Sequence, residues 1–177
     1  MAGQTPPHNL RLDNALWRMA TTLWEAPGFA DACLQAQTHG ISVTHLLVAL
    51  YSTECARLWS GSEPSALASW RQEMTEPLRR LRQTLEKDNQ AVQSLREQIK
   101  SAELSAEQVE LAWWAHLIER DHDSDDWHYS PMDITALASD NLQAAGLDDS
   151  QSALHERLLQ LWHQHGKGVT FPRHKQN

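Results

Sequence analysis

The feature that most constrains this chain is a set of apolar residues in its middle that recur in alternating steps of three and four. On an α-helix such spacing forms one narrow stripe, which is the pattern of a coiled-coil seam. The seam residues are Leu78, Leu81, Leu85, Val92, Leu95, Ile99, Ala102, Ala106, Val109 and Trp113, and Asp88 interrupts them. A narrow apolar stripe needs a cover, so this part of the chain must pair with another helix.

Two geometries satisfy the seam. One is a single long helix over residues 76–120, and the other is a helical hairpin that turns near Lys87, Asp88 and Asn89. Pro77 predicts a kink or a fresh helix start at its own position. Ser105 and Gln108 resemble a capping box, which makes a break near residue 104 a third, less favoured option.

The rest of the chain also carries helical periodicity. Shorter helices are predicted over residues 10–24, 27–40, 43–60, 62–74, 131–146 and 150–165, and period-two runs typical of strands do not appear. The helix over residues 43–60 is apolar on nearly every side, so we expect it at the centre of the bundle. The prediction is an all-α, single-domain helical bundle over residues 10–165, with flexible segments at 1–9 and 166–177.

Composition excludes several classes of protein. The formal net charge is -8, and residues 101–160 carry thirteen acidic side chains against Arg120 and Arg157 alone, so free nucleic acid is not an expected partner. The chain has no apolar stretch long enough to span a bilayer and no visible signal peptide. Its two cysteines suggest no disulfide framework. We therefore expect a cytoplasmic protein.

Several short motifs follow one another along the chain in a recognisable order. They are Leu16-Trp17, Leu23-Trp24, Pro27-Gly28, Ala32-Cys33-Leu34, His39-Gly40, Trp70, Pro77-Leu78-Arg79, Leu81-Arg82 and Ile99-Lys100-Ser101-Ala102-Glu103-Leu104. Over residues 16–111 the chain resembles a bacterial family of short helical proteins known only as a domain of unknown function, family 2390. It departs from that pattern at Thr44, where the family commonly has asparagine. The resemblance implies a helical fold and a bacterial cytoplasmic protein, and it supplies no catalytic residues.

A dense group of imidazoles and carboxylates is the most suggestive candidate for a metal site. Its members are His116, Asp121, His122, Asp123, Asp125, Asp126 and His128. A calcium loop is excluded, because Asp126 replaces the required glycine and Met132 the bidentate glutamate. A solvated acidic loop is the preferred interpretation, so no metal and no cofactor is expected. A metal-dependent enzyme that uses residues 116–128 remains one alternative.

Tryptophans and one histidine suggest a second alternative. A bundle core lined by aromatic side chains can hold a small apolar or aromatic ligand. The candidate pocket residues are Trp17, Trp24, His45, Trp59 and Trp70. The more economical interpretation is ordinary core packing, with His45 as a hydrogen-bonded residue at the edge of the core.

A protein partner is the leading functional hypothesis. Arg79, Arg80 and Arg82 form a small basic surface beside the seam, and Trp113 and Trp114 point about 100° apart on one helix, so one of them can face a partner. No phosphate loop, nucleophile elbow or zinc-protease motif occurs, and no catalytic residue is proposed. The sequence therefore predicts a non-catalytic helical interaction module that binds a protein partner or a second copy of itself.

Overall fold

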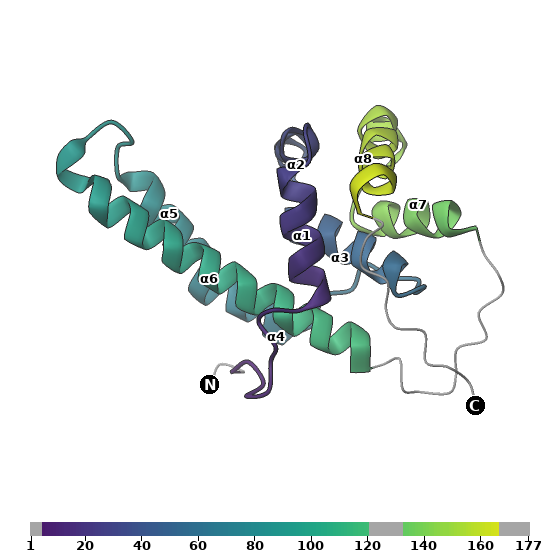
Figure 1. Cartoon of the computed structure of the whole chain (residues 1–177), viewed down its shortest axis with the longest axis horizontal. Helices are drawn as coiled ribbons and strands as arrows, with labels where there is room; N and C mark the ends of the chain where they lie inside the picture. The colour runs from purple at the N-terminus through teal and green to yellow at the C-terminus, as the bar shows by residue number, and fades with distance from the viewer. Residues whose placement is uncertain (1–4, 121–132, 167–177) are drawn as a thin grey trace. The chain divides into compact units, whose positions relative to one another are not determined.

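The computed structural model describes residues 5–120 and 133–166, and within these ranges it contains helices and no strand (Figure 1). The all-α prediction is confirmed. The chain divides into two compact units, one made of the N-terminal segment up to Leu12 with Glu63–His116, and the other of Asp13–Ser62 with the chain from Leu117 onward. Most of the predicted flexible ends, and the predicted loop after residue 120, lie outside the described residues.

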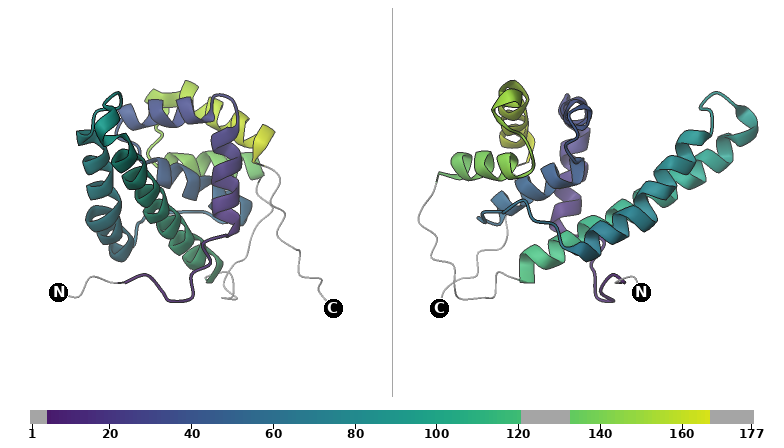
Figure 2. Two further views of the ribbon diagram at one scale, coloured as in Figure 1. Left: turned by 60° about the vertical axis from the view of Figure 1, so that its left-hand side comes forward. Right: turned by 180° about the vertical axis from the view of Figure 1, so that it is seen from behind.

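The first unit is built around a helical hairpin. Its first arm comprises α4 (Ser65–Trp70), a π-helical turn η1 (Arg71–Thr75) and α5 (Glu76–Thr84), and its second arm is the long helix α6 (Gln90–Arg120), whose last residues belong to the other unit. The two arms run side by side in opposite directions in every view (Figure 1, Figure 2). Of the two predicted geometries, the hairpin is the one that forms.

The turn between the arms explains this choice. Asn89 begins α6, because its side-chain oxygen accepts a hydrogen bond from the backbone N–H of Ala91 at 3.0 Å. The Arg96 guanidinium donates to the carbonyl of Leu85 at 3.2 Å and fastens the turn to the second arm. Asp88 lies within this turn, so the polar residue that interrupts the seam never has to be buried.

Two predicted interruptions take another form. At Pro77 the helical run does not break, because the π-helical turn η1 leads directly into α5, in which Pro77 is the second residue. The break considered near residue 104 does not occur. There the Ser105 hydroxyl donates to the carbonyl of Ser101 at 3.0 Å inside a continuous helix.

The second unit packs shorter helices around α3 (Val43–Glu54). The other members are α1 (Ala15–Glu25), α2 (Phe29–Thr38), α7 (Ile134–Ala144), the 3-10 turn η3 (Asp149–Gln151) and α8 (Ser152–His165). Eight consecutive residues of α3, from Leu46 to Thr53, are buried, and α3 packs against α1, α2 and α7. The helix that is apolar all round is thus the central one, as predicted.

Some helix boundaries differ from the prediction for local reasons. Helix α3 ends at Glu54 rather than near residue 60, because Ala56 adopts a positive φ of 54° and the N–H of Arg57 turns back to the carbonyl of Ser52. Helix α2 begins after Gly28, whose φ is 88°, rather than at the preceding proline. None of the described helices combines the length and the apolar character needed to cross a membrane.

Candidate interaction surface

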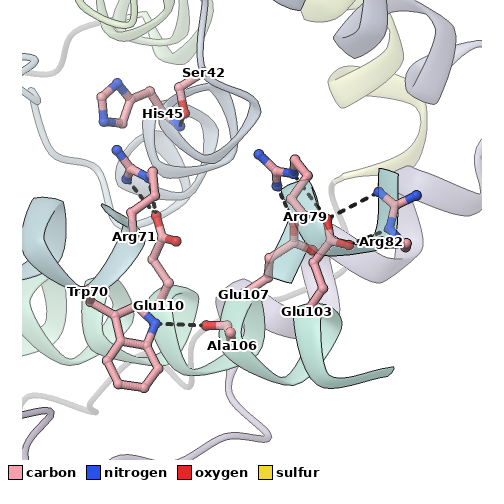
Figure 3. Close-up of polar contacts among 10 residues, drawn as sticks. All are labelled: Ser42, His45, Trp70, Arg71, Arg79, Arg82, Glu103, Ala106, Glu107 and Glu110. Carbon is pink, nitrogen blue, oxygen red and sulfur yellow. Dashed lines mark hydrogen bonds and ion pairs between the residues drawn. The ribbon is translucent and has the colours of Figure 1, made fainter. Parts of the chain in front are cut away.

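A row of ion pairs joins the two arms of the hairpin (Figure 3). Arg71 donates to Glu110 at 2.9 Å and also pairs with Glu63. Arg79 reaches Glu103 at 3.0 Å and Glu107 at 2.6 Å, and Arg82 is bonded to Glu103 as well. We call these seven residues the arginine–glutamate ladder.

Helix geometry accounts for the order of the ladder. Glu103, Glu107 and Glu110 are separated by four and three residues, so they share one face of α6. The arginines recur on one face of the first arm in the same way. Because the arms are antiparallel, Arg71, the first arginine of the ladder along the chain, meets Glu110, the last of the three glutamates on α6. Arg82, the last arginine, meets Glu103, the first of those three glutamates.

The ladder is largely removed from solvent at one end. The side chain of Glu110 is 2% exposed and that of Arg71 is 18% exposed. Burial raises the pKa of the Glu110 carboxyl even though Arg71 opposes the shift, and burial likewise raises the pKa of Glu107. At Glu103 burial also disfavours the charge, but hydrogen bonds from Arg82 and Arg79 outweigh it and lower the pKa.

The charged groups of the ladder pair with one another inside the hairpin. Guanidinium groups stay protonated and present a planar fork that suits carboxylates, so the paired arms are held in one register. Arg79 and Arg82, which the sequence suggested as partner contacts, are bonded within the chain. Arg80 alone of the three is exposed, with Glu76 at 3.4 Å. Their contact with a partner remains a prediction.

One side of the ladder is lined by apolar residues. There the indole N–H of Trp70 donates to the carbonyl of Ala106 at 3.0 Å (Figure 3). Apolar residues continue the Trp70 side along both arms at helical spacing. They are Met74, Leu78 and Leu81 on the first arm and Leu95 and Ala102 on α6, and we call them the apolar face of the hairpin.

The apolar face is only partly covered. Met74 is 42% exposed, Leu81 50% and Leu95 49%. Other seam residues of α6, such as Ile99 and Ala106, are buried instead, and they alternate along the helix with exposed Leu95 and Ala102. The hairpin therefore covers one edge of its own seam and leaves the other edge open.

The remaining predicted partner residues lie in the interior. Trp113 is 6% exposed and Trp114 is 3% exposed, both near the end of α6. Neither indole is available on the surface of the structure as described. Core packing is the role that this burial favours.

The predicted ligand-pocket residues are only partly brought together. His45 and Trp59 stack edge to face with ring centroids 5.5 Å apart, and the Ser42 hydroxyl caps α3 by accepting from the N–H of His45 (Figure 3). Trp17 is half-buried on α1 and Trp24 on the same helix is 46% exposed. Trp70 belongs to the other compact unit.

The predicted metal residues fall mostly outside the described structure. His116 lies half-buried on α6, whereas Asp121, His122, Asp123 and His128 are not among the described residues. Within residues 5–120 and 133–166, no three histidine, cysteine or acidic side chains gather in a way that could hold a metal ion.

The cysteines are poor nucleophiles. Burial raises the pKa of the Cys33 thiol to about 12, and burial is also the main cause that raises the pKa of Cys55 to about 12. A thiol with so high a pKa is almost entirely protonated at neutral pH, and only the thiolate attacks electrophiles. Both residues therefore act as small apolar groups.

Sequence reasoning missed the polar residue that organises the second unit. Asn141, which is fully buried, donates to the carbonyl of Arg57 at 2.8 Å and the hydroxyl of Thr53 at 2.9 Å, and it accepts from the N–H of Trp59 at 2.7 Å. These bonds attach the chain that leaves α3 to α7. A lone polar residue on the apolar face of α7, beside Leu137, was the available signal.

A second missed group holds the last residues of α6 in this unit. The Tyr51 hydroxyl donates to Glu119 at 2.8 Å, and the Arg57 guanidinium donates to the backbone carbonyl of Ile118. A cation at a helix C-terminus is favourable, because unpaired carbonyls there carry partial negative charge. Neither contact is local in sequence, so periodicity gives no hint of it.

Fold and surface together define an all-α protein with a helical hairpin whose arms are joined by ion pairs. A family model described as "Protein of unknown function (DUF2390)" matches residues 15–113, and the chain belongs to this family. The match includes every residue of the ladder, from Glu63 to Glu110. No curated protein and no solved structure gives a significant match.

Proposed function

We propose that this protein is a non-catalytic helical interaction module of the cytoplasm, and that the apolar face of the hairpin is its binding surface. The observation that carries the proposal is the half-exposure of Met74, Leu81 and Leu95 on one side of an ion-paired hairpin. Exposed leucines in isolation are ordinary, but several in a row at helical spacing on one face indicate a contact with another protein.

The ladder supports this proposal in a second way. A binding surface works best when its shape is fixed before the partner arrives, because less conformational entropy is then lost on binding. Arg71, Arg79 and Arg82 fix the register of the two arms, and so they fix the positions of Leu81 and Leu95 relative to each other. The ladder is thus support for the surface rather than the surface itself.

The chemistry of the described residues also favours binding over catalysis. The ladder carboxylates are engaged by guanidiniums, and both thiols have a pKa of about 12. A general acid or base needs a pKa close to the working pH and access to a substrate. Nothing in the proposal depends on a cofactor or a metal.

The test is affinity capture of the full chain from a native lysate of its source, run with a surface variant and a matched control. Leu81→Glu places a charge on the apolar face, whereas Leu104→Glu places one at an equally exposed leucine, 52% against 50%, on another side of the hairpin. The proposal expects a stoichiometric protein that Leu81→Glu loses and Leu104→Glu retains. Equal capture by both variants, with unchanged circular dichroism, would show that the surface lies elsewhere.

Reversing Arg79 or Arg82 is not a suitable test of the surface. Each forms an ion pair with Glu103 inside the hairpin, so reversal would replace an attractive pair by a repulsive one and destabilise the contact between the arms. Arg80→Glu is the informative charge variant, because its side chain is 65% exposed. A partner that also contacts the basic surface is expected to bind Arg80→Glu more weakly.

A further inference from the structure

One side of α6 has no charge along most of its length within the first unit. Six charged residues occur between Gln90 and His116, namely Arg96, Glu97, Lys100, Glu103, Glu107 and Glu110. At 100° per residue they all fall within an arc of about 140° on the helix surface. The remaining arc of about 220° contains most seam residues of α6, Leu95 among them, and no charged side chain.

Much of the charge-free arc is exposed. The exposed residues are Ala91, Ser94, Leu95, Gln98, Ser101, Ala102 and Ser105, and apart from Leu95 and Gln98 all are small. Leu95 and Ala102 belong to the apolar face, which Leu81 and Met74 continue on the first arm. Small residues allow two helix backbones to approach closely, and a few larger apolar ones between them fill the gaps.

We infer that the apolar face and the charge-free arc of α6 pair with the same surface of a second copy of this chain. This rests on the proposed function and names its partner. In a twofold symmetric dimer a surface contacts itself, so a charge near the axis meets a like charge. A different partner is usually selected by complementary charge, which this arc lacks. The surface is therefore suited to self-pairing.

The residue pattern specifies the pairing. When two α6 helices run antiparallel with the twofold axis beside Gln98, Leu95 of one copy faces Ala102 of the other. Each large side chain thus meets a small one, which is the requirement of close helix packing. Arg96, Lys100 and the ladder glutamates lie outside the contact.

The size of the surface predicts a weak dimer. Residues 91–109 of α6 extend about 27 Å, and two helices side by side are about 20 Å wide. The footprint is roughly 500 Å² per copy, which places the dimer near the lower limit of about 1,000 Å² in total for specific interfaces. We expect dissociation in the micromolar range.

The test is sedimentation velocity of the full chain over a range of concentrations, with single and mixed variants. Leu95→Lys and Ala102→Glu should each weaken dimerisation by about 100-fold or more, because symmetry introduces every charge twice. Their equimolar mixture should dimerise again, since the introduced lysine and glutamate then face each other. Leu104→Lys, whose leucine lies within the charged arc nine residues from Leu95, should dimerise like the unmodified chain.

The outcomes separate this inference from the proposed function. A chain that stays monomeric at every concentration overturns self-pairing, and so does a dimer insensitive to Leu95→Lys. If the monomeric chain still captures another protein through Leu81, the interaction-module proposal stands with a different partner. If it captures none, both fail. Recovery in the mixture excludes misfolding as the cause of a monomeric variant.

Discussion

Replacing Arg71 by methionine should destabilise the hairpin more than any other single change in the ladder. The Arg71 side chain lies between Glu63, which is 16% exposed, and Glu110, which is 2% exposed. A methionine side chain has nearly the length of the arginine but no charge, so two buried carboxylates are left facing each other. Removing one partner of a buried ion pair costs about 3–5 kcal/mol of unfolding free energy.

The pH dependence of this loss gives a second measure. Without Arg71, the pKa of Glu110, already raised by burial, should rise further above its unfolded value of about 4.5. A carboxyl whose pKa is higher in the folded state than in the unfolded state adds most to the free energy of unfolding when the pH is below the unfolded pKa. This contribution is lost as the pH rises through the folded pKa. The destabilisation of Arg71→Met should therefore be smaller at pH 5 than at pH 7, by about 1.4 kcal/mol per unit of pKa shift.

Two further variants isolate the ion pair. Arg71→Met with Glu110→Met removes the guanidinium and the more buried of its two carboxylate partners, so that only Glu63 loses its ion pair, and should recover about 2 kcal/mol of the loss. Arg80→Met removes an exposed pair with Glu76 and should cost less than about 0.5 kcal/mol.

The assay should use urea, which leaves charge pairs unscreened, with helix content followed by circular dichroism. Amide hydrogen exchange along α6 localises the effect to the hairpin, because the chain contains two compact units. If Arg71→Met costs no more than Arg80→Met at pH 7, the ladder does not hold the arms together.

Three further outcomes are expected. Asn141→Ala removes the bonds that attach the end of α3 to α7 and should lower the unfolding free energy by about 3 kcal/mol or more in urea titration. Gly61→Ala should lower the free energy of unfolding clearly more than Gly40→Ala. Both glycines have a positive φ, which strains an alanine by about 1–2 kcal/mol. Only at Gly61 would the new methyl group also lie 2.5 Å from a backbone oxygen. The stability difference between the unmodified chain and Glu103→Gln should be fully present above pH 4.5 and be lost as pH falls from 4.5 through the lower folded pKa, because the folded carboxylate contributes only while it is ionised. Equal costs at the two glycines, or a pH-independent Glu103 difference, would contradict these arguments.

Periodicity predicted the helices well because it reports which face each helix buries. The seam over residues 78–113 and the all-apolar Leu46–Tyr51 stretch identified the hairpin arms and the central helix. Apolar residues spaced by three and four are expected both when a helix pairs within its own chain and when it pairs with another chain. The spacing therefore could not decide between a hairpin and one long helix. Asp88 and Asn89 decide it, through a turn that keeps one polar residue out of the seam and begins α6 with the other.

The ladder was harder to predict than the helices. Arg79, Arg80 and Arg82 stood out as a basic cluster, yet two of them turn inward. Their partners, Glu103 and Glu107, looked like part of a long acidic region. Which charge meets which depends on the register of the two arms, and the turn sets that register. A hydrophobic pattern contains no information on it.

The division of the chain into units also has a consequence for the order of folding. The hairpin unit is complete once His116 has been synthesised, whereas the other unit needs α7 and α8, whose Leu142 and Trp162 are fully or almost fully buried. The apolar faces of α1, α2 and α3 therefore stay uncovered during synthesis until the hairpin unit has been made and α7 and α8 follow it. A hairpin that forms early fixes Glu63 and His116 relative to each other, and this lowers the entropy lost when the two segments of the other unit join. Any change that slows formation of the hairpin prolongs the exposure of α1 and α3, so we expect aggregation during synthesis to depend on the stability of the ladder even though the ladder lies in the other unit.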